Sequence, residues 1–402
     1  MKMMKDIKVR NAILIGSLCS LSYLAVYIAR NMLSAVTPQM IESNRFTTEY
    51  IGTLSSLYFI FYSVGQLING IIGDKVKARY MISFGLFLAG VCNVVFPYIA
   101  DVPEAAQMVY GMSGFFLSMI YGPMAKLVAE NAEPVYAVRC SIGYQFASLL
   151  GSPVAGVIAA FFVWQSVFKV GSVTLFVMGA LCFILFGAME KFRVIKYNQY
   201  ERKDEKKTEA KIKILIQNGI LKATLLAVIT GVVRTTVVFW LPTYISQHLG
   251  FSTEKSAFIF TGATFAISMT TFIAIFVYEK LKRNMNLTTL LAFASAAVFF
   301  LLVYFLEIPA LNIIFLVAAI MSSNSASTML FSVYCPRLRD TGMVSSAAGY
   351  LDFVSYMAAA GSSTIFANAV TSIGWGKLIL IWFALMVLGV AISLPYKKRE
   401  VK

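Results

Sequence analysis

The chain contains twelve apolar stretches, each long enough to cross a lipid bilayer. A membrane-spanning helix needs about 20 consecutive, mainly apolar residues. Stretches of this kind lie near 12–36, 50–73, 80–100, 105–128, 140–162, 166–189, 217–246, 256–278, 287–306, 309–333, 343–369 and 375–395. Apolar residues make up 59% of the 402 residues and charged residues only 13%, which separates the chain from soluble domains. The sequence therefore predicts an all-α membrane protein with twelve transmembrane helices.

A charged stretch near the middle of the chain, KFRVIKYNQYERKDEKKTEAKIK at 191–213, divides these helices six and six. We expect an N-terminal six-helix half at 1–190, a cytoplasmic central loop at 191–215 and a C-terminal six-helix half at 216–402. The basic start MKMMKDIKVR precedes an apolar run longer than the core of a signal peptide. We therefore expect this run to remain in the protein as the first transmembrane helix.

Most lysines and arginines fall on one side of the membrane if the chain crosses it twelve times. They cluster at both termini, in the central loop and in the loops after the second, fourth, eighth and tenth helices. Because cytoplasmic loops are enriched in Lys and Arg, we expect both termini to be cytoplasmic in a protein of the plasma membrane. This topology accounts for the net charge of +15, so no nucleic-acid partner is expected. Two basic residues, Arg30 and Arg234, lie within spans instead.

Matched pairs of residues recur at a nearly constant separation along the chain. Arg30 and Arg234 are 204 residues apart, and Pro38 and Pro242 have the same separation. Three further pairs are separated by 205, 205 and 206 residues: FTTE (46–49) with FSTE (251–254), DKVK (74–77) with EKLK (279–282), and GY (143–144) with GY (349–350). The pairs indicate a duplicated six-helix unit, whose parallel copies are related by an axis along the membrane normal. We expect the two arginines to lie at equal depth and to converge on one site in a central cavity.

Arginine within a span is costly and therefore informative. It costs about 2.5–3.5 kcal/mol on insertion scales, so two such residues indicate either a function or a structural pairing with an acid. We favour a substrate site lining the cavity. A guanidinium group stays charged at any working pH and binds oxyanions through two parallel hydrogen bonds. A doubly charged phosphate or a dicarboxylate matches two of them.

Other polar residues accompany the arginines within the spans. Tyr23 and Tyr27 precede Arg30 by seven and three residues, which puts them on or near its helix face, either to bind substrate oxygens or to pack. Asp352 lies within the eleventh span with Tyr356 four residues later. Three roles are open for this acid: counter-ion of an arginine, ligand of a cationic group on the substrate, or site of a coupling proton. Three further polar residues lie within spans: Gln66, Gln145 and Asn324. Each either lines the same cavity or makes a hydrogen bond to a neighbouring helix.

Nothing in the sequence indicates an enzyme, a metal site or a cofactor. The chain has neither a GxxxxGK[ST] phosphate-binding run nor a cluster of nucleophile and base. The lone histidine, His248, lies in a polar turn after an apolar run, as a surface residue would. The cysteines are odd in number and scattered, so no disulfide framework is expected. They are Cys19, Cys92, Cys140, Cys182 and Cys335.

The stretch GIIGDKVKAR (70–79) resembles the loop between the second and third helices of the major facilitator superfamily. That motif runs from a glycine to an acid and then to basic residues. The resemblance implies the facilitator fold with its central cavity. It also assigns a gating loop motif to Asp74, Lys75 and Arg79, and its second copy to Glu279 and Lys280.

A narrower resemblance surrounds the two arginines. YLAVYIAR (23–30) and VVRTTVVFWLPTY (232–244) are similar to the first and seventh helices of the organophosphate:phosphate antiporter family, in which these arginines hold the phosphate. The resemblance implies a substrate site of Arg30, Arg234, Tyr23, Tyr27, Tyr62 and Tyr356, with Asp352, Gln66 and Gln145 beside them. Three positions depart from the glycerol-3-phosphate member: Gln66 replaces a lysine, Phe239 replaces an acid, and the fifth helix lacks a histidine. We therefore do not carry over that substrate.

These observations lead us to expect a secondary transporter. It would exchange a small organic phosphate for inorganic phosphate by alternating access across the lipid bilayer, without a cofactor, and as a monomer by analogy of fold. Three alternatives stay open: a proton-coupled organic-anion symporter with Asp352 as the proton site, a drug exporter, and a non-transporting sensor on the same fold.

Overall fold

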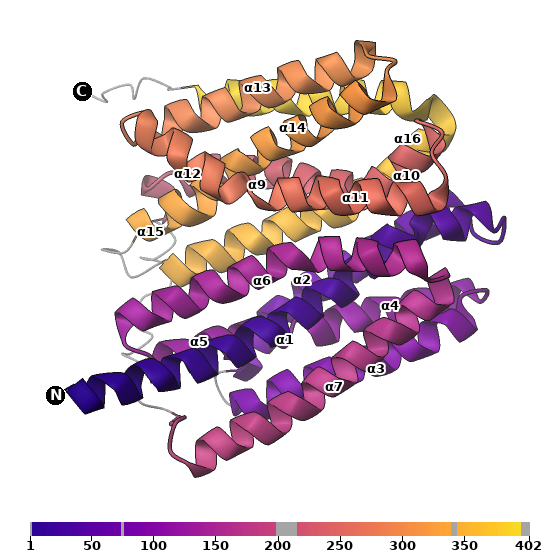
Figure 1. Cartoon of the computed structure of the whole chain (residues 1–402). Helices are drawn as coiled ribbons and strands as arrows, with labels where there is room; N and C mark the ends of the chain where they lie inside the picture. The colour runs from indigo at the N-terminus through magenta and orange to yellow at the C-terminus, as the bar shows by residue number, and fades with distance from the viewer. Residues whose placement is uncertain (1, 74–75, 198–214, 339–343, 395–402) are drawn as a thin grey trace. The chain divides into compact units, whose positions relative to one another are not determined.

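The computed structural model describes residues 2–73, 76–197, 215–338 and 344–394 (Figure 1). Secondary structure in these ranges is helical, and they contain no strand. Asp74 and Lys75 of the expected loop motif lie outside the described residues, as does most of the expected central loop.

The chain divides into two compact units. Unit 1 is Met1–Asp204 with Gly250–Phe265, and unit 2 is Glu205–Leu249 with Ala266–Lys402. The short segment Gly250–Phe265 comes from the second half of the sequence but packs with unit 1. Its Thr261 hydroxyl donates to the Pro153 carbonyl at 3.4 Å. A Cβ at Gly156 would come within 2.3 Å of the same hydroxyl oxygen, so a glycine is required where this segment packs.

Unit 1 is built around the long first helix. Its helices are α1 (Lys2–Glu42), α2 (Thr48–Gly73), α3 (Ala78–Ile99), α4 (Pro103–Leu117), α5 (Tyr121–Asn131), α6 (Pro134–Phe161) and α7 (Trp164–Lys191), with α11 (Thr253–Ser268) as far as Phe265. Helix α1 packs along α6. The approach is close at Gly151, where a Cβ would lie 2.3 Å from the Cβ of Tyr27. This glycine therefore holds α6 against the turn of α1 that precedes Arg30.

Unit 2 is arranged around its own first helix and the C-terminal helix. Its elements are α9 (Ile220–Gly231), η1 (Val232–Val237), α10 (Val238–Gln247), α12 (Thr270–Lys280), α13 (Met285–Phe305), α14 (Pro309–Thr328), η2 (Met329–Tyr334), α15 (Cys335–Arg337) and α16 (Val344–Ser393). Helix α9 meets α16 at Gly231, where a Cβ would lie 2.5 Å from the Ser355 carbonyl oxygen. The contact brings the residues that follow Gly231 close to α16.

We expect Gly231→Ala to destabilise unit 2. The added Cβ would strike backbone of α16, which yields less readily than a side chain, and overpacking of this kind costs about 1–3 kcal/mol. Thermal unfolding of the purified protein in detergent measures the effect. Gly361→Ala is the matched control, because a Cβ at that helical glycine meets no atom within 4 Å. Equal unfolding temperatures for the two variants would contradict the close contact of α9 with α16.

The number of membrane spans agrees with the sequence. Eleven helical runs in the described ranges are long and apolar enough to span a membrane. The last of these, Ala347–Ser393, contains two spans, because Gly374 breaks the helix with φ 76° and ψ 170°. The break falls between the predicted spans 343–369 and 375–395. Twelve transmembrane helices and an all-α membrane architecture are therefore confirmed.

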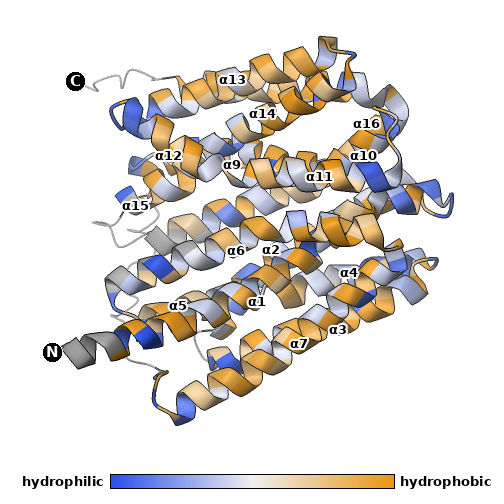
Figure 2. Ribbon diagram, viewed as in Figure 1, coloured by the Kyte–Doolittle hydropathy of each residue, from blue (hydrophilic) through white to orange (hydrophobic). Residues whose placement is uncertain are grey.

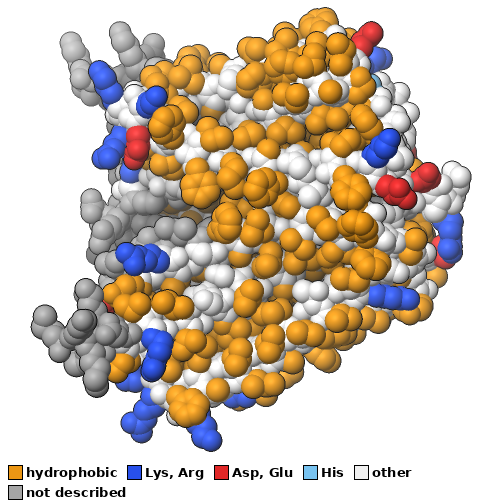
Figure 3. All heavy atoms as spheres, viewed as in Figure 1, with side chains coloured by type: hydrophobic (Ala, Val, Ile, Leu, Met, Phe, Trp, Pro, Cys, Tyr) orange, Lys and Arg blue, Asp and Glu red, His pale blue; other side chains and the backbone are white. Residues whose placement is uncertain are grey.

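Apolar residues fill the middle of the helices, and polar residues gather near the helix ends (Figure 2). The space-filling view shows the same distribution, with hydrophobic side chains over the helices and charged ones near their ends (Figure 3). Large side chains such as Phe84 and Phe87 in unit 1, and Phe272 and Phe276 in unit 2, are exposed. A surface of this kind is stable against lipid tails rather than water, so the chain is an integral, multi-pass membrane protein.

Several spans differ from the uninterrupted helices that the sequence predicts. Helix α1 extends well beyond the predicted 12–36 at both ends. A turn at 118–120 separates α4 from α5, and Met269 separates α11 from α12. Hydropathy reports the length of an apolar run but not these interruptions, since the residues at the breaks remain compatible with a helix.

Candidate functional site

Arg30 lies on α1 in unit 1, half-buried among aromatic rings. Its Cζ atom is 5.1 Å from the centre of the Tyr27 ring, 5.1 Å from that of Tyr62 and 5.7 Å from that of Phe59. Tyr27 precedes Arg30 by one turn, and the other two rings come from α2. The quadrupole of an aromatic ring attracts a cation at such distances. The structure therefore brings together three predicted residues, Arg30, Tyr27 and Tyr62, and adds Phe59.

Tyr23 lies one turn before Tyr27 and belongs to a wider aromatic cluster. Its ring centre is 4.9 Å from that of Tyr27, 5.6 Å from that of Tyr121 and 6.0 Å from that of Tyr144. Tyr23 is 6% exposed. Its described ring contacts are with other tyrosines. Tyr23 therefore packs against the Tyr27 ring and helps to fix the position of that ring beside Arg30.

Arg234 lies in unit 2 and forms an ion pair with an acid. Its Nη2 atom donates to Oδ1 of Asp352 at 3.3 Å, and the two side chains are 31% and 27% exposed. Its Cζ atom is also 5.7 Å from the ring centre of Tyr356 and 5.5 Å from that of Phe331. Asp352 and Tyr356 are one turn apart on α16, so one helix face presents both to the guanidinium. The close approach of α9 to α16 at Gly231 makes this possible.

Two π-helical segments meet at Arg234. The first, η1, contains Arg234 itself, and the second, η2, contains Phe331. A π-turn widens the helix by one residue and re-aims the side chains around it, and such turns are frequent at functional sites. No π-turn interrupts α1, which carries Arg30. The two arginines are therefore presented by different backbone conformations, although the sequence repeat relates their positions.

The remaining predicted residues stand at different places. Gln66 is half-buried on α2, one turn beyond Tyr62. Gln145 belongs to α6, but its side chain lies outside the described part of the chain. Asn324 lies on α14, where its side-chain Oδ1 is buried and accepts no hydrogen bond in the described structure. Phe239, at the position where the glycerol-3-phosphate member has an acid, is buried and packs edge-on against Trp240.

Comparison with known proteins decides the family. The model of the Major Facilitator Superfamily matches residues 19–363. The chain belongs to this superfamily. The relatives that match most of the chain are transporters, so the chain is a transporter and not an enzyme.

Relatives of this facilitator match it over most of its length. The glycerol-3-phosphate transporter of Bacillus subtilis is 24% identical over 378 residues, covering 87% of this chain and 83% of that protein. The phosphoglycerate transporter protein of Salmonella typhimurium is 24% identical over 384 residues, covering 88% and 82%. Both relatives confirm the resemblance to transporters of phosphate esters. The solved D-xylose-proton symporter shares the fold, with a TM-score of 0.74 at 13% identity and coverage of 97% and 98% of the two chains.

Of the three residues assigned to the facilitator loop motif, Arg79 lies within the described part of the chain. The Arg79 Cζ atom lies 4.0 Å from the centre of the Phe183 ring. The Nη1 atom of Arg79 lies 3.8 Å from a carboxylate oxygen of Glu190. Gly187 leaves room for it, since a Cβ there would come within 2.6 Å of the Arg79 Cζ. The Tyr197 hydroxyl donates to the other Glu190 oxygen at 2.7 Å. Burial raises the pKa of Tyr197, and this hydrogen bond raises it further, so the hydroxyl keeps its proton.

The second copy of the motif is described at both of its assigned residues. Glu279 and Lys280 are exposed at the end of α12, where the Lys280 ammonium lies 4.7 Å from the centre of the Phe276 ring. The residues that correspond to them in the first copy, Asp74 and Lys75, lie outside the described residues.

Side chains that could bind a metal ion do not cluster in the described part of the chain. Among the described residues, no three His, Cys, Asp or Glu side chains are grouped as a metal site would require. The five cysteines are buried and free. His248 lies just beyond α10 with its ring 5.0 Å from that of Tyr244. His248 is exposed, as expected of a surface residue, and its partial burial lowers its pKa below the ordinary value.

Proposed function

We propose that this transporter carries a small phosphate ester in exchange for inorganic phosphate, and that Arg30 and Arg234 bind the phosphate. One observation carries the proposal. Each repeat-related arginine is half-buried within a span and held over aromatic rings that leave part of it accessible. A cation in such a setting has lost much of its water, so a dianion gains more from binding it than it would from an exposed arginine. The phosphate esters carried by the two relatives support the same substrate class.

The Arg234–Asp352 pair supports a role for Asp352 as counter-ion. Without substrate, the carboxylate neutralises part of the positive charge at the site. A bound phosphate would compete with Asp352 for the guanidinium of Arg234, because both ligands offer paired oxygens to the same donors. Asp352 would then turn to a hydroxyl or amino group on the organic part of the substrate. Binding and release would thus exchange one anionic ligand of Arg234 for another.

The sequence repeat supports alternating access by the two halves, 1–190 and 216–402, joined by the loop 191–215. In this mechanism the phosphate bridges the two arginines and favours reorientation of the loaded carrier. A carrier that reorients more readily when loaded than when empty yields exchange. We further propose a monomer in the plasma membrane with both termini in the cytoplasm, as the distribution of Lys and Arg favours.

The Arg234–Asp352 contact also favours a second candidate, a proton-coupled organic-anion symporter in which protonation of Asp352 releases Arg234. The two candidates differ in what drives uptake. Exchange needs anion on both sides of the membrane, whereas symport is driven by a proton gradient and proceeds even into an empty interior.

The test is uptake of radiolabelled phosphate into proteoliposomes that contain the purified protein. With phosphate inside, exchange predicts rapid uptake that unlabelled phosphate esters inhibit, and the inhibition series ranks the esters as substrates. With an empty interior and an inward proton gradient, exchange predicts no uptake above protein-free liposomes. Uptake under the second condition alone would favour the symporter. Absence of flux under both conditions, in protein that unfolds cooperatively, would reject both and favour the sensor.

A further inference from the structure

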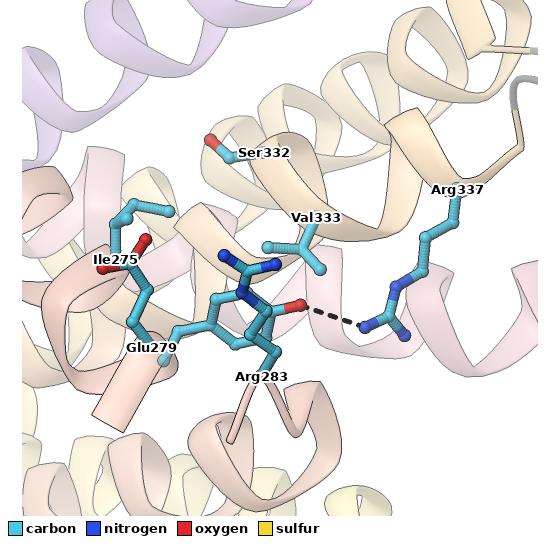
Figure 4. Close-up of a pocket in the computed structure, with 7 residues that line it drawn as sticks. Ile275, Glu279, Arg283, Ser332, Val333 and Arg337 are labelled. Carbon is cyan, nitrogen blue, oxygen red and sulfur yellow. Dashed lines mark hydrogen bonds between the residues drawn. The ribbon is translucent and has the colours of Figure 1, made fainter. Parts of the chain in front are cut away.

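A pocket of about 420 Å³ opens in unit 2, lined by α12, η2 and one residue that follows each of them. Its lining residues are Ile275, Tyr278, Glu279, Arg283, Ser332, Val333 and Arg337 (Figure 4). None of these residues belongs to the arginine site described above. The function proposed above makes no use of this pocket.

The floor of the pocket is apolar and the rim is basic. Val333 is buried in a small core cluster with Ala274 and Met329, and Ile275 and Tyr278 pack against that cluster. Arg283 and Arg337 are exposed above it. A single acid, Glu279, also lines the pocket, and in Figure 4 its carboxylate lies beside Ile275, away from Arg337. Two guanidinium groups against one carboxylate leave the rim net positive.

Both arginines are oriented by the structure around them. The Arg337 Nη2 atom donates to the Tyr278 hydroxyl at 3.2 Å, which directs this guanidinium toward the pocket (Figure 4). Arg283 has φ of 58° and follows Lys282, whose φ is 54°. Two consecutive non-glycine residues in the left-handed region cost energy, and such conformations cluster where ligands bind. In Figure 4 this turn raises Arg283 toward Ser332 and Val333.

The position of the pocket along the spans suits an amphiphilic ligand. The floor residues Ile275 and Val333 lie inside the spans Thr253–Lys280 and Pro309–Tyr334. Arg283 and Arg337 lie three residues beyond the ends of these spans. The basic rim is therefore at the level where the hydrocarbon core gives way to water, with the apolar floor just inside it.

We propose that this pocket binds a phosphate group, held between the guanidinium groups of Arg283 and Arg337. Ser332 lines the same pocket, and in Figure 4 its hydroxyl points away from the two arginines. Such a phosphate group belongs either to the headgroup of a lipid or to a free phosphate compound, and the two groups have the same chemistry. A lipid would also place its glycerol backbone and upper acyl chain on Ile275 and Val333.

Chemical protection of the arginines by ligand tests the proposal in the full-length protein. Phenylglyoxal modifies accessible guanidinium groups, and peptide mass spectrometry reports each arginine separately. The probes are inorganic phosphate, dihexanoyl phosphatidylglycerol, and dihexanoylglycerol as the lipid without phosphate. We expect Arg283 and Arg337 to be protected together. Protection by both phosphate-bearing probes identifies free phosphate as a sufficient ligand, and protection by the phospholipid alone identifies a lipid headgroup.

Arg193 is the internal control, because it is exposed and has a left-handed φ of 56° but lies outside the pocket. Equal protection of Arg193, protection by dihexanoylglycerol, or no protection by either phosphate-bearing probe would each overturn the proposal. The readout is specific to these arginines, so the result is independent of whether the protein exchanges phosphate through Arg30 and Arg234.

A pair of substitutions tests whether the two arginines act together. Arg283→Gln removes one cation, so half-protection of Arg337 should require about tenfold more ligand. Lys282→Gln is the matched control, because Lys282 is adjacent, exposed and also left-handed but does not line the pocket. It should leave the protection of Arg337 unchanged. An equal effect of the two substitutions would indicate general surface charge and reject the site.

Discussion

We expect Arg30→Lys and Arg234→Lys each to lower phosphate exchange about 30-fold to 100-fold, because lysine retains the charge but lacks the fork that binds an oxyanion through two parallel hydrogen bonds. Lysine keeps a cation near the rings around Arg30 and near the carboxylate of Asp352, so we expect both variants to fold. Initial rates of labelled phosphate uptake into phosphate-loaded proteoliposomes measure the loss.

Arg45→Lys provides the control for these variants. Arg45 is an exposed arginine of unit 1 that pairs with Asp101 at the surface, and it lies outside the predicted site. We expect its exchange rate to match that of the unchanged protein. Full exchange by either site variant, in protein with an unchanged unfolding temperature, would show that its arginine does not hold the phosphate.

Asp352→Asn is expected to tighten phosphate binding and to leave exchange insensitive to a proton gradient. The substitution removes the anion that competes for Arg234, while asparagine keeps the shape and one acceptor oxygen. The ion pair is 31% and 27% exposed, so solvent screens it. We therefore expect a gain of about 1 kcal/mol, or about a fivefold lower half-saturating phosphate concentration. The concentration dependence of exchange at constant pH gives this number.

The same variant separates the two candidate functions. If Asp352 carries a coupling proton, Asp352→Asn abolishes uptake driven by a proton gradient and does not tighten phosphate binding. Asp101→Asn is the control, since Asp101 belongs to the exposed pair with Arg45. It should change neither the half-saturating concentration nor the response to pH.

The architecture could be predicted from sequence because each span carries its own signal. A run such as 287–306 is long enough to cross the bilayer whatever surrounds it, and α13 (Met285–Phe305) matches it closely. Even the break inside the C-terminal run was marked, since Gly374 falls between two apolar stretches. The packing of Gly250–Phe265 with unit 1 carried no such signal, because it depends on contacts between distant segments.

The centre of the candidate site was predictable for a different reason. Arg30, Arg234 and Asp352 are charges in apolar runs, where they are too costly to occur by chance. The sequence predicted only some of the aromatic residues whose rings contact Arg30 and Arg234. Tyr27, Tyr62 and Tyr356 were predicted, but Phe59 and Phe331 are two of 32 phenylalanines, and composition or periodicity does not distinguish them from lipid-facing ones. The π-turns were missed because they follow from packing and have no composition of their own.

The ion pair of Arg234 makes the surroundings of this arginine sensitive to ionic strength. The ring contacts of Arg30 are with neutral groups, which mobile ions barely screen. The contact of Arg234 with Asp352 is between two partly exposed charges, and the screening length falls from about 10 Å at 0.1 M salt to about 3 Å at 1 M. Concentrated salt would therefore loosen the counter-ion of Arg234 while leaving the rings around Arg30 in place. A titration with an inert salt thus weakens the Arg234–Asp352 contact in the unmodified protein.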